Sequence, residues 1–181
     1  MRLFVALELG APARTALAAW GTEVAARDRA LRPTAPAGLH LTLAFLGARP
    51  PADVAPLEEA LPAAVAAGPW PDELAVGGGI WLPERRPSVL TVSVADPGDV
   101  LAALQSRVAD ACREAVGWEP ERRRFRPHVT VARLRRGSIP RTYDVAEPPG
   151  VGVPATGVAL FSSVLEQAGA RHEVLARALP G

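Results

Sequence analysis

Two short segments of the chain repeat a histidine and a threonine in the same local frame. "HLTLAFLG" spans His40–Gly47 and "HVTVARL" spans His128–Leu134, although the whole chain has only three histidines. Alternate side chains of a β-strand share a face, so each histidine lies beside the threonine two places on, while the apolar residues between them face the core. An imidazole accepts or donates a proton near neutral pH, and a hydroxyl donates a hydrogen bond to an anionic oxygen. The pattern predicts acid–base chemistry on a phosphate.

Each side chain of the two motifs has a role in that chemistry. One imidazole would take a proton from water, and the other would give a proton to the departing oxygen. Thr42 and Thr130 would donate hydrogen bonds to the non-bridging phosphate oxygens. The spacing does not say whether His40 or His128 is the acid. Neither motif has the Asp, Glu and His clustering of a two-metal phosphoesterase, so we expect no metal and no other cofactor. The alternative is that each histidine is an ordinary polar residue at the start of a strand.

All 20 basic residues are arginine, and the formal net charge is +1. The absence of lysine excludes a lysine–nucleotide adduct, a Schiff-base lysine and a Walker-type phosphate loop. Eight arginines gather in the segment 119–141, namely Arg122, Arg123, Arg124, Arg126, Arg133, Arg135, Arg136 and Arg141. Such a cluster either binds an anionic ligand, because guanidinium pairs with phosphate in a bidentate manner, or is a solvated loop.

Alternating strands and helices must position these motifs. Periodicity and turn residues predict strands at 2–8, 39–46, 73–82, 88–95, 128–134, 155–165 and 172–179, and helices at 11–27, 52–67 and 100–116. The Pro/Gly-rich segment 32–38 should hold neither a helix nor a central strand, and 138–152 should be irregular. The fold class is therefore α+β. Each half contains a strand, a helix and a strand that begins with His-x-Thr, which indicates an internal duplication.

Length and composition limit the kind of protein. At 181 residues and 49% hydrophobic content, the chain suits one domain or two small packed lobes. The single cysteine, Cys112, allows no internal disulfide and lies on the core-facing side of the helix predicted at 100–116. No apolar run approaches the ~20 residues that cross a bilayer, and the first residues have the pattern of a strand and lack the features of a signal peptide. We expect a cytoplasmic monomer without membrane contact.

The quoted segments resemble a known superfamily. "HLTLAFLG" and "FRPHVTVAR", with the opening "RLFVAL" and the closing "VLEQAGARHEVLARALP", are similar to the 2H phosphoesterases, in particular the RNA 2′,3′-cyclic phosphodiesterases long called 2′-5′ RNA ligases. The resemblance covers nearly the whole chain. It implies one bilobal catalytic domain over residues 1–181, in which two pseudo-symmetric lobes of antiparallel sheet with outer helices surround a cleft. It also implies hydrolysis of a terminal 2′,3′-cyclic phosphate on RNA to a 2′-phosphomonoester.

The resemblance also implies a role for each motif residue. His40 would be the proton donor to the 3′ oxygen, and His128 would be the proton acceptor from water. Thr42 and Thr130 would bind phosphate oxygens.

Two further residues follow their histidines by five positions. By the resemblance, Arg133 contacts the phosphate and Phe45 stacks on the nucleobase, a contact that tolerates any base. An odd offset points away from the histidine face unless the strand bulges or ends. Core packing of Phe45 and a surface ion pair of Arg133 are therefore the alternatives.

The chain also departs from the family pattern. "PTAPAG" replaces a Trp-Val-Pro-Pro-Glu-Asn-like lead-in, so substrate contacts from this connector are not carried over. His172 stands where the family often has an aromatic residue, usually tyrosine, and we expect it to be structural or exposed. Other functions fit the same residues: a phosphodiesterase for small nucleoside cyclic phosphates, ATP-independent 2′-5′ RNA ligation, or a non-catalytic RNA-binding module.

Overall fold

The structure is a computed structural model that describes residues 1–120, 123–139, 142–166 and 169–181. The strands are β1 (Arg2–Leu9), β2 (Leu31–Pro33), β3 (His40–Ala48), β4 (Glu73–Leu82), β5 (Val89–Ala95), β6 (His128–Leu134), β7 (Gly152–Glu166) and β8 (Gly169–Ala178). The helices are α1 (Ala11–Arg27), α2 (Val54–Ala66) and α3 (Val100–Val116), and single 3-10 turns occur at Pro36–Gly38 and Pro51–Asp53.

The predicted α+β class and the order of the main elements are confirmed. Helices α1 and α3 have the predicted bounds. The connector at 32–38 is more ordered than predicted, because it contains most of β2 and a 3-10 turn. Within the described residues β2 pairs only with β6, so Pro33 lies at an edge where its missing N–H is tolerated. The connection between the strands predicted at 155–165 and 172–179 lies partly outside the described residues.

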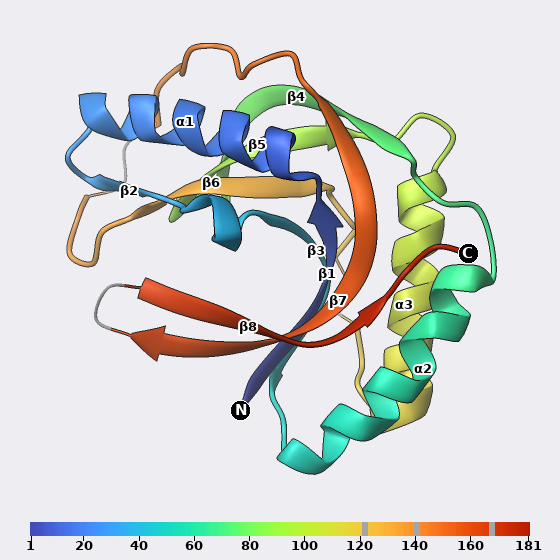
Figure 1. The fold of residues 1–181 in the computed structure, drawn as a ribbon. Coiled ribbons are helices and arrows are strands. Elements are labelled where there is room, and N and C mark those ends of the chain that lie inside the picture. The colour runs from blue at the N-terminus through green and yellow to red at the C-terminus, as the bar shows by residue number, and fades with distance from the viewer. Residues whose placement is uncertain (121–122, 140–141, 167–168) are drawn as a thin grey trace.

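The antiparallel strands form a ring. They follow the order β1-β3-β6-β5-β4-β7, and an additional pairing of β7 with β1 closes the circuit. Strand β8 pairs with β7, and β2 pairs with β6. Helices α2 and α3 lie side by side against one part of the ring, while α1 runs across another part and contacts β2 and β6 (Figure 1). The strands that carry the two motifs, β3 and β6, are neighbours in this ring.

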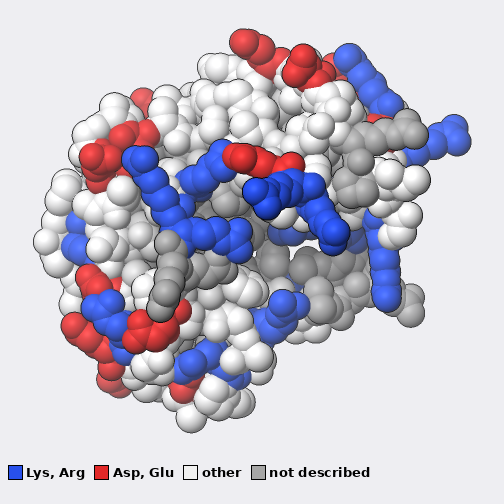
Figure 2. Space-filling view, turned by 180° about the vertical axis from the view of Figure 1, so that it is seen from behind, with Lys and Arg blue, Asp and Glu red and all other residues white. Residues whose placement is uncertain are grey.

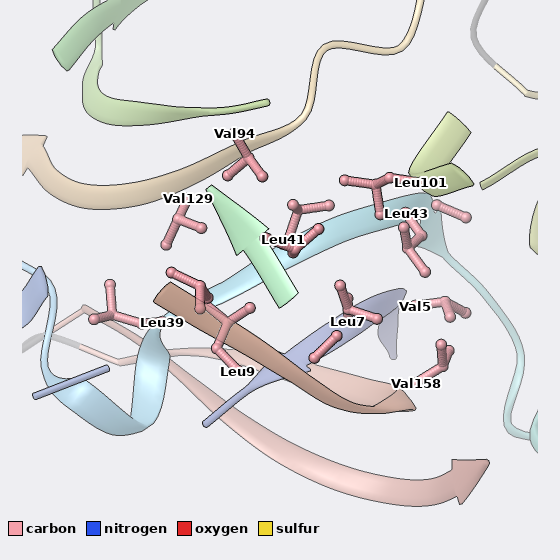
Figure 3. Packing of buried hydrophobic residues seen from close by; sticks show 14 of the residues in the cluster. Val5, Leu7, Leu9, Leu39, Leu41, Leu43, Val94, Leu101, Val129 and Val158 are labelled. Carbon is pink, nitrogen blue, oxygen red and sulfur yellow. The ribbon is translucent and has the colours of Figure 1, made fainter. Parts of the chain in front are cut away.

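The main core lies between these strands and the helices. Alternate residues of β1, including Val5 and Leu7, meet Leu41 of β3 and Val129 of β6 there (Figure 3). A second, smaller cluster covers the other face of β1 and consists of Phe4, Ala6, Ala159 and Phe161, with Val174 against it. Strand β1 is thus buried on both faces. The smaller cluster lies next to one of the two motif histidines, as described below.

Helix α1 packs directly against β6. A Cβ atom added to Gly21 of α1 would lie 2.7 Å from the carbonyl oxygen of Val131, which is closer than Cβ atoms approach backbone. Glycine at this position therefore permits direct contact between the helix and the strand. The helix fixes the part of β6 that immediately follows the histidine and threonine.

Candidate active site

The two motif strands meet at one residue pair. Leu41 of β3 and Val129 of β6 are antiparallel partners, and both are fully buried. Because the two strands are antiparallel, His40 lies toward the side of Thr130, and Thr42 lies toward the side of His128. These four side chains project to the face opposite Leu41 and Val129. The charge of His128 acts on the ring of His40, so the two imidazoles lie near each other on this face. The structure brings the four predicted residues together.

Both motif strands bulge at the corresponding place. The register of β3 against β1 skips Leu43, and the register of β6 against β5 skips Val131. In each strand two consecutive residues are buried after the threonine, where strict alternation would bury only one. The extra residue reverses the alternation, so Phe45 and Arg133 return to the histidine face. The bulges therefore explain how residues five positions after each histidine can lie on the same face of the strand as the histidine.

Phe45 lies at the edge of a groove and does not belong to the core. Its residue surface is 48% exposed, so the core-packing alternative is wrong. The guanidinium carbon of Arg2 lies 5.8 Å from the ring centroid, within the range of a cation–π contact. Phe45 lines the same groove as Thr42 and His128.

Arg133 is exposed on β6, opposite Val89 of β5 and Arg32 of β2. Among the described residues the structure gives Arg133 no ion pair, so that alternative finds no support there. Desolvation and the charge of Arg32 lower the pKa of the Arg133 guanidinium. Two guanidinium groups on facing strand positions favour an anion between or beside them.

His128 is held in one tautomer by the backbone. Its Nδ1 lies 2.7 Å from the carbonyl oxygen of Arg126, two residues earlier. A carbonyl oxygen only accepts hydrogen bonds, so Nδ1 carries the hydrogen. In the neutral ring, Nε2 then has a free lone pair that can take a proton.

His40 lies in an aromatic cluster, defined here as Phe4, Phe161, His40 and His172. Its ring centroid is 4.8 Å from that of Phe4, 5.7 Å from that of Phe161 and 5.3 Å from that of His172. The ring of His172 stands edge-on to that of His40, at an interplanar angle of 86°.

This environment strongly favours a neutral His40. Burial, more than any other cause, lowers its pKa to about 3, and the charges of His172, Arg133 and His128 act in the same direction. A hydrogen bond to the backbone of Gly38 opposes them. The repeated motif therefore places its two histidines in unlike surroundings, one in an aromatic cluster and one at a groove.

A groove of about 1020 Å³ extends from the motifs along α3 and the loop before β6. Arginines line it, namely Arg85, Arg113, Arg123, Arg124 and Arg126. Arg126 pairs with Glu84 at 2.6 Å and Arg113 with Asp110 at 2.7 Å, so part of this charge is neutralised. Figure 2 shows basic side chains around a hollow on the face seen there. Of the arginines predicted to cluster, Arg122 and Arg141 lie outside the described residues.

Comparison with known proteins shows to which family the chain belongs. A family model described as the 2′-5′ RNA ligase superfamily matches residues 12–163, most of the chain. The chain belongs to this superfamily. A Thermus thermophilus protein named RNA 2′,3′-cyclic phosphodiesterase is 32% identical over 97% of this chain and 88% of its own length. A Geobacillus stearothermophilus protein of the same name is 41% identical over 56% of this chain, but the match spans only 32% of that protein.

The fold agrees with a solved member of the 2′-5′ RNA ligase superfamily. The crystal structure of Escherichia coli LigT complexed with 3′-AMP superposes with a TM-score of 0.75 at 26% identity, over 99% of this chain and 97% of that one. The resemblance that the motifs indicated is therefore confirmed.

Several residues around the candidate site of this chain were not predicted from the sequence. His172, which was expected to be structural or exposed, is half-buried and lies against the ring of His40. Phe4 and Phe161 pack beside His40, and Arg32 faces Arg133. No local pattern marks these residues, because only the pairings of β1, β7 and β8 bring the aromatic rings together.

The described residues contain neither a metal-binding cluster nor a helix that could cross a membrane. Within those residues, no group of three His, Cys, Asp or Glu side chains is arranged to hold a metal ion. None of their helices is long and apolar enough to span a bilayer. Cys112 is fully buried, as predicted, and burial raises the pKa of its thiol to about 12.

Proposed function

We propose that the protein hydrolyses a terminal 2′,3′-cyclic phosphate on RNA to a 2′-phosphomonoester by acid–base catalysis between His40 and His128, without a metal ion. The observation that carries this proposal is the convergence of both His-x-Thr motifs on one face, around the Leu41–Val129 pair. Membership of the 2′-5′ RNA ligase superfamily supports it, as do the relatives named RNA 2′,3′-cyclic phosphodiesterase. In this proposal the chain is one bilobal catalytic domain, and each lobe contributes one motif.

The reaction begins at His128. Its Nε2 takes a proton from water as the water oxygen bonds to phosphorus. The bond from phosphorus to the 3′ oxygen breaks, and His40 gives its proton to that oxygen. The products are a 2′-phosphomonoester and a 3′-hydroxyl, with the proton now on His128. Thr42 and Thr130 donate hydrogen bonds to the non-bridging oxygens, and Arg133 stabilises their charge.

His40 must acquire its proton before it can donate it. Without substrate the ring is neutral at pH 7, because its pKa is about 3. A bound cyclic phosphate carries negative charge beside the ring, and a nearby negative charge favours the imidazolium. Substrate binding and proton uptake are therefore coupled in this proposal. A protein that bound substrate without proton uptake would need a different acid.

The groove favours an RNA end over a small cyclic nucleotide. Its volume of about 1020 Å³ is at the upper end of the usual range of about 300–1,000 Å³ for small-ligand pockets, and arginines line its walls. Phe45 offers an exposed ring at its edge on which a base can stack. A nucleotide phosphate and base would fill the end near the motifs, leaving the rest of the groove for the preceding nucleotides. We expect the protein to act as a monomer in the cytoplasm.

A defined RNA oligonucleotide with a 2′,3′-cyclic phosphate end tests the proposal directly. The expected product is a 2′-phosphate, formed equally well with and without EDTA. His40→Ala and His128→Ala should each lower kcat by at least about a hundredfold, because each removes a proton-transfer group. A 3′-phosphate product would contradict the assigned leaving group, and loss of activity in EDTA would contradict the metal-independent mechanism.

The same experiment separates the alternatives. A non-catalytic RNA-binding module would bind the oligonucleotide without turnover, and binding would survive both substitutions. A phosphodiesterase for small nucleotides would have the same kcat/KM for a nucleoside 2′,3′-cyclic phosphate as for the oligonucleotide. Ligation is detected by incubating the 2′-5′-linked dimer and its two halves without ATP.

A further inference from the structure

The third histidine lies in direct contact with the proposed proton donor. His172 of β8 stands edge-on to the ring of His40, with centroids 5.3 Å apart. It also stands edge-on to Phe4, with centroids 5.0 Å apart. Phe4 in turn stacks on Phe161 at 4.9 Å. His172 is thus a member of the aromatic cluster, and its ring packs directly against that of His40.

The buried nitrogen of His172 limits its charge. Its Nδ1 is buried and has no hydrogen-bond partner within the described part of the chain. A protonated imidazole carries a hydrogen on both nitrogens, so protonation would place an N–H at Nδ1 without an acceptor. Buried polar groups usually have partners, and an unsatisfied donor is costly. The geometry therefore favours the neutral ring with its hydrogen on Nε2.

Other charged groups around the two rings oppose a second proton. His128 and Arg133 of β6 both act against a positive charge on His40, and Arg133 does so on His172 as well. Burial is the largest cause that lowers the pKa of each of these two rings.

The remaining charges come from the neighbouring strands. Arg32 of β2 faces Arg133. Glu8 of β1 pairs with His40 in register, but Arg177 of β8 binds its carboxylate at 2.8 and 3.2 Å. The carboxylate of the residue paired with His40 is thus already neutralised by an arginine.

We propose that His172 is a positioning residue, which holds the ring of His40 in place and limits the two imidazoles to one proton between them. This inference rests on the proposed function, because it assigns His172 to the acid side of that reaction. When the phosphate binds, the proton resides on His40, which has a backbone hydrogen bond at Gly38, and not on His172, whose Nδ1 lacks an acceptor. The proton is then next to the oxygen that leaves.

Substitutions at one position separate the two parts of the role. His172→Phe keeps an aromatic ring of similar shape against His40 but cannot be charged. His172→Ala removes the ring as well. Glu173→Gln is the matched control, because Glu173 is the exposed neighbour on the same strand and its side chain points to the other face.

Nuclear magnetic resonance gives a readout that does not depend on activity. The chain has three histidines, so three imidazole signals are followed with pH and assigned by single substitutions. In His172→Phe the titration midpoint of His40 should move to higher pH, because at acid pH a proton on His172 opposes a proton on His40 and phenylalanine takes up none. Glu173→Gln should leave the midpoint where it is in the wild type. An unchanged midpoint in His172→Phe would overturn the inference.

Kinetics supply the second readout. The alkaline limb of the kcat profile, which reports the protonated acid in the substrate complex, should move to higher pH in His172→Phe. In His172→Ala, kcat should fall about ten- to a hundredfold through misplacement of His40, with the folded signal retained. Full kcat in His172→Ala would also overturn the inference. If the wild type does not hydrolyse the cyclic phosphate, the proposed function fails, while the titration still decides whether the two rings share one proton.

Discussion

Leu41 and Val129 are antiparallel partners at the centre of the site, and each lies one residue after a motif histidine. The strands then bulge at equivalent positions, Leu43 and Val131. The backbone of the two motifs is therefore closely similar around this pair. The differences that suit an acid and a base come from what surrounds each strand: aromatic rings beside His40, and a groove beside His128.

The two threonines should matter through their hydroxyls alone. Valine has nearly the same shape, so Thr42→Val and Thr130→Val remove a hydrogen-bond donor while they preserve the strand. Each change should lower kcat by about a hundredfold, in the range for loss of one donor to a developing oxyanion. Thr22→Val, on the exposed side of α1, is the matched control. Steady-state kinetics on the cyclic-phosphate oligonucleotide measures the effect, and wild-type kcat in both variants would remove the threonines from the mechanism.

A sulfur leaving group distinguishes the acid from the base. A cyclic substrate with sulfur in place of the 3′ oxygen releases a thiolate, which leaves without a proton. His40→Ala should therefore recover most of its lost rate on this substrate, whereas His128→Ala should remain impaired because water still needs a base. The ratio of kcat values for the oxygen and sulfur substrates is the measurement. Rescue of His128→Ala instead would exchange the two roles.

Arg133 should contribute to substrate binding through its planar charge. Arg133→Gln should raise KM about ten- to a hundredfold, the range expected for loss of a hydrogen bond to a charged group. Arg133→Lys should give a smaller rise, because lysine keeps the charge but not the bidentate geometry. Arg136→Gln, three residues later and exposed, is the control. An unchanged KM in Arg133→Gln would mean that this arginine does not reach the phosphate.

Gly21→Ala should destabilise the protein, contrary to the usual effect of alanine in a helix. Alanine normally stabilises a helix interior by about 1 kcal/mol relative to glycine. Here its Cβ would lie 2.7 Å from the carbonyl oxygen of Val131, so α1 must move away from β6. Thermal unfolding should show a lower Tm, and kcat should also fall because the bulge shifts. An increased Tm would mean that the helix moves aside without cost.

The sequence was enough to predict the motif residues and most of the strands that carry them. His-x-Thr was recognisable because its chemistry and its strand alternation are local, and α1 and α3 were recognisable from helical periodicity. Phe45 and Arg133 were harder to place. Their orientation depends on the bulges at Leu43 and Val131, and a bulge is defined by the register against a partner strand.

The contact between His40 and His172 could not be predicted from local sequence patterns, because it also depends on how distant strands pair. The two residues are far apart in sequence, and they meet only because β1 pairs with both β3 and β7, and β7 pairs with β8. The pKa of His40 has the same origin. A motif shows that an imidazole is present, whereas its preference for the neutral form is set by burial among rings from other strands.

The lowered pKa of His40 should make the protein less stable in acid. The ordinary pKa of histidine is 6.5, and the folded protein lowers that of His40 to about 3. Between these values the unfolded chain binds a proton that the folded chain does not, so the free energy of unfolding falls as the pH falls, by at most about 1.4 kcal/mol per pH unit from this group. Above pH 6.5 the group has no effect on the pH dependence. His40→Phe keeps an aromatic ring in the cluster and removes the titration, so its Tm should decline less than that of the wild type between pH 6.5 and pH 4. Calorimetry on both proteins makes the comparison, and carboxylates contribute equally to each. Identical declines would show that His40 titrates in the folded protein much as it does in the unfolded chain.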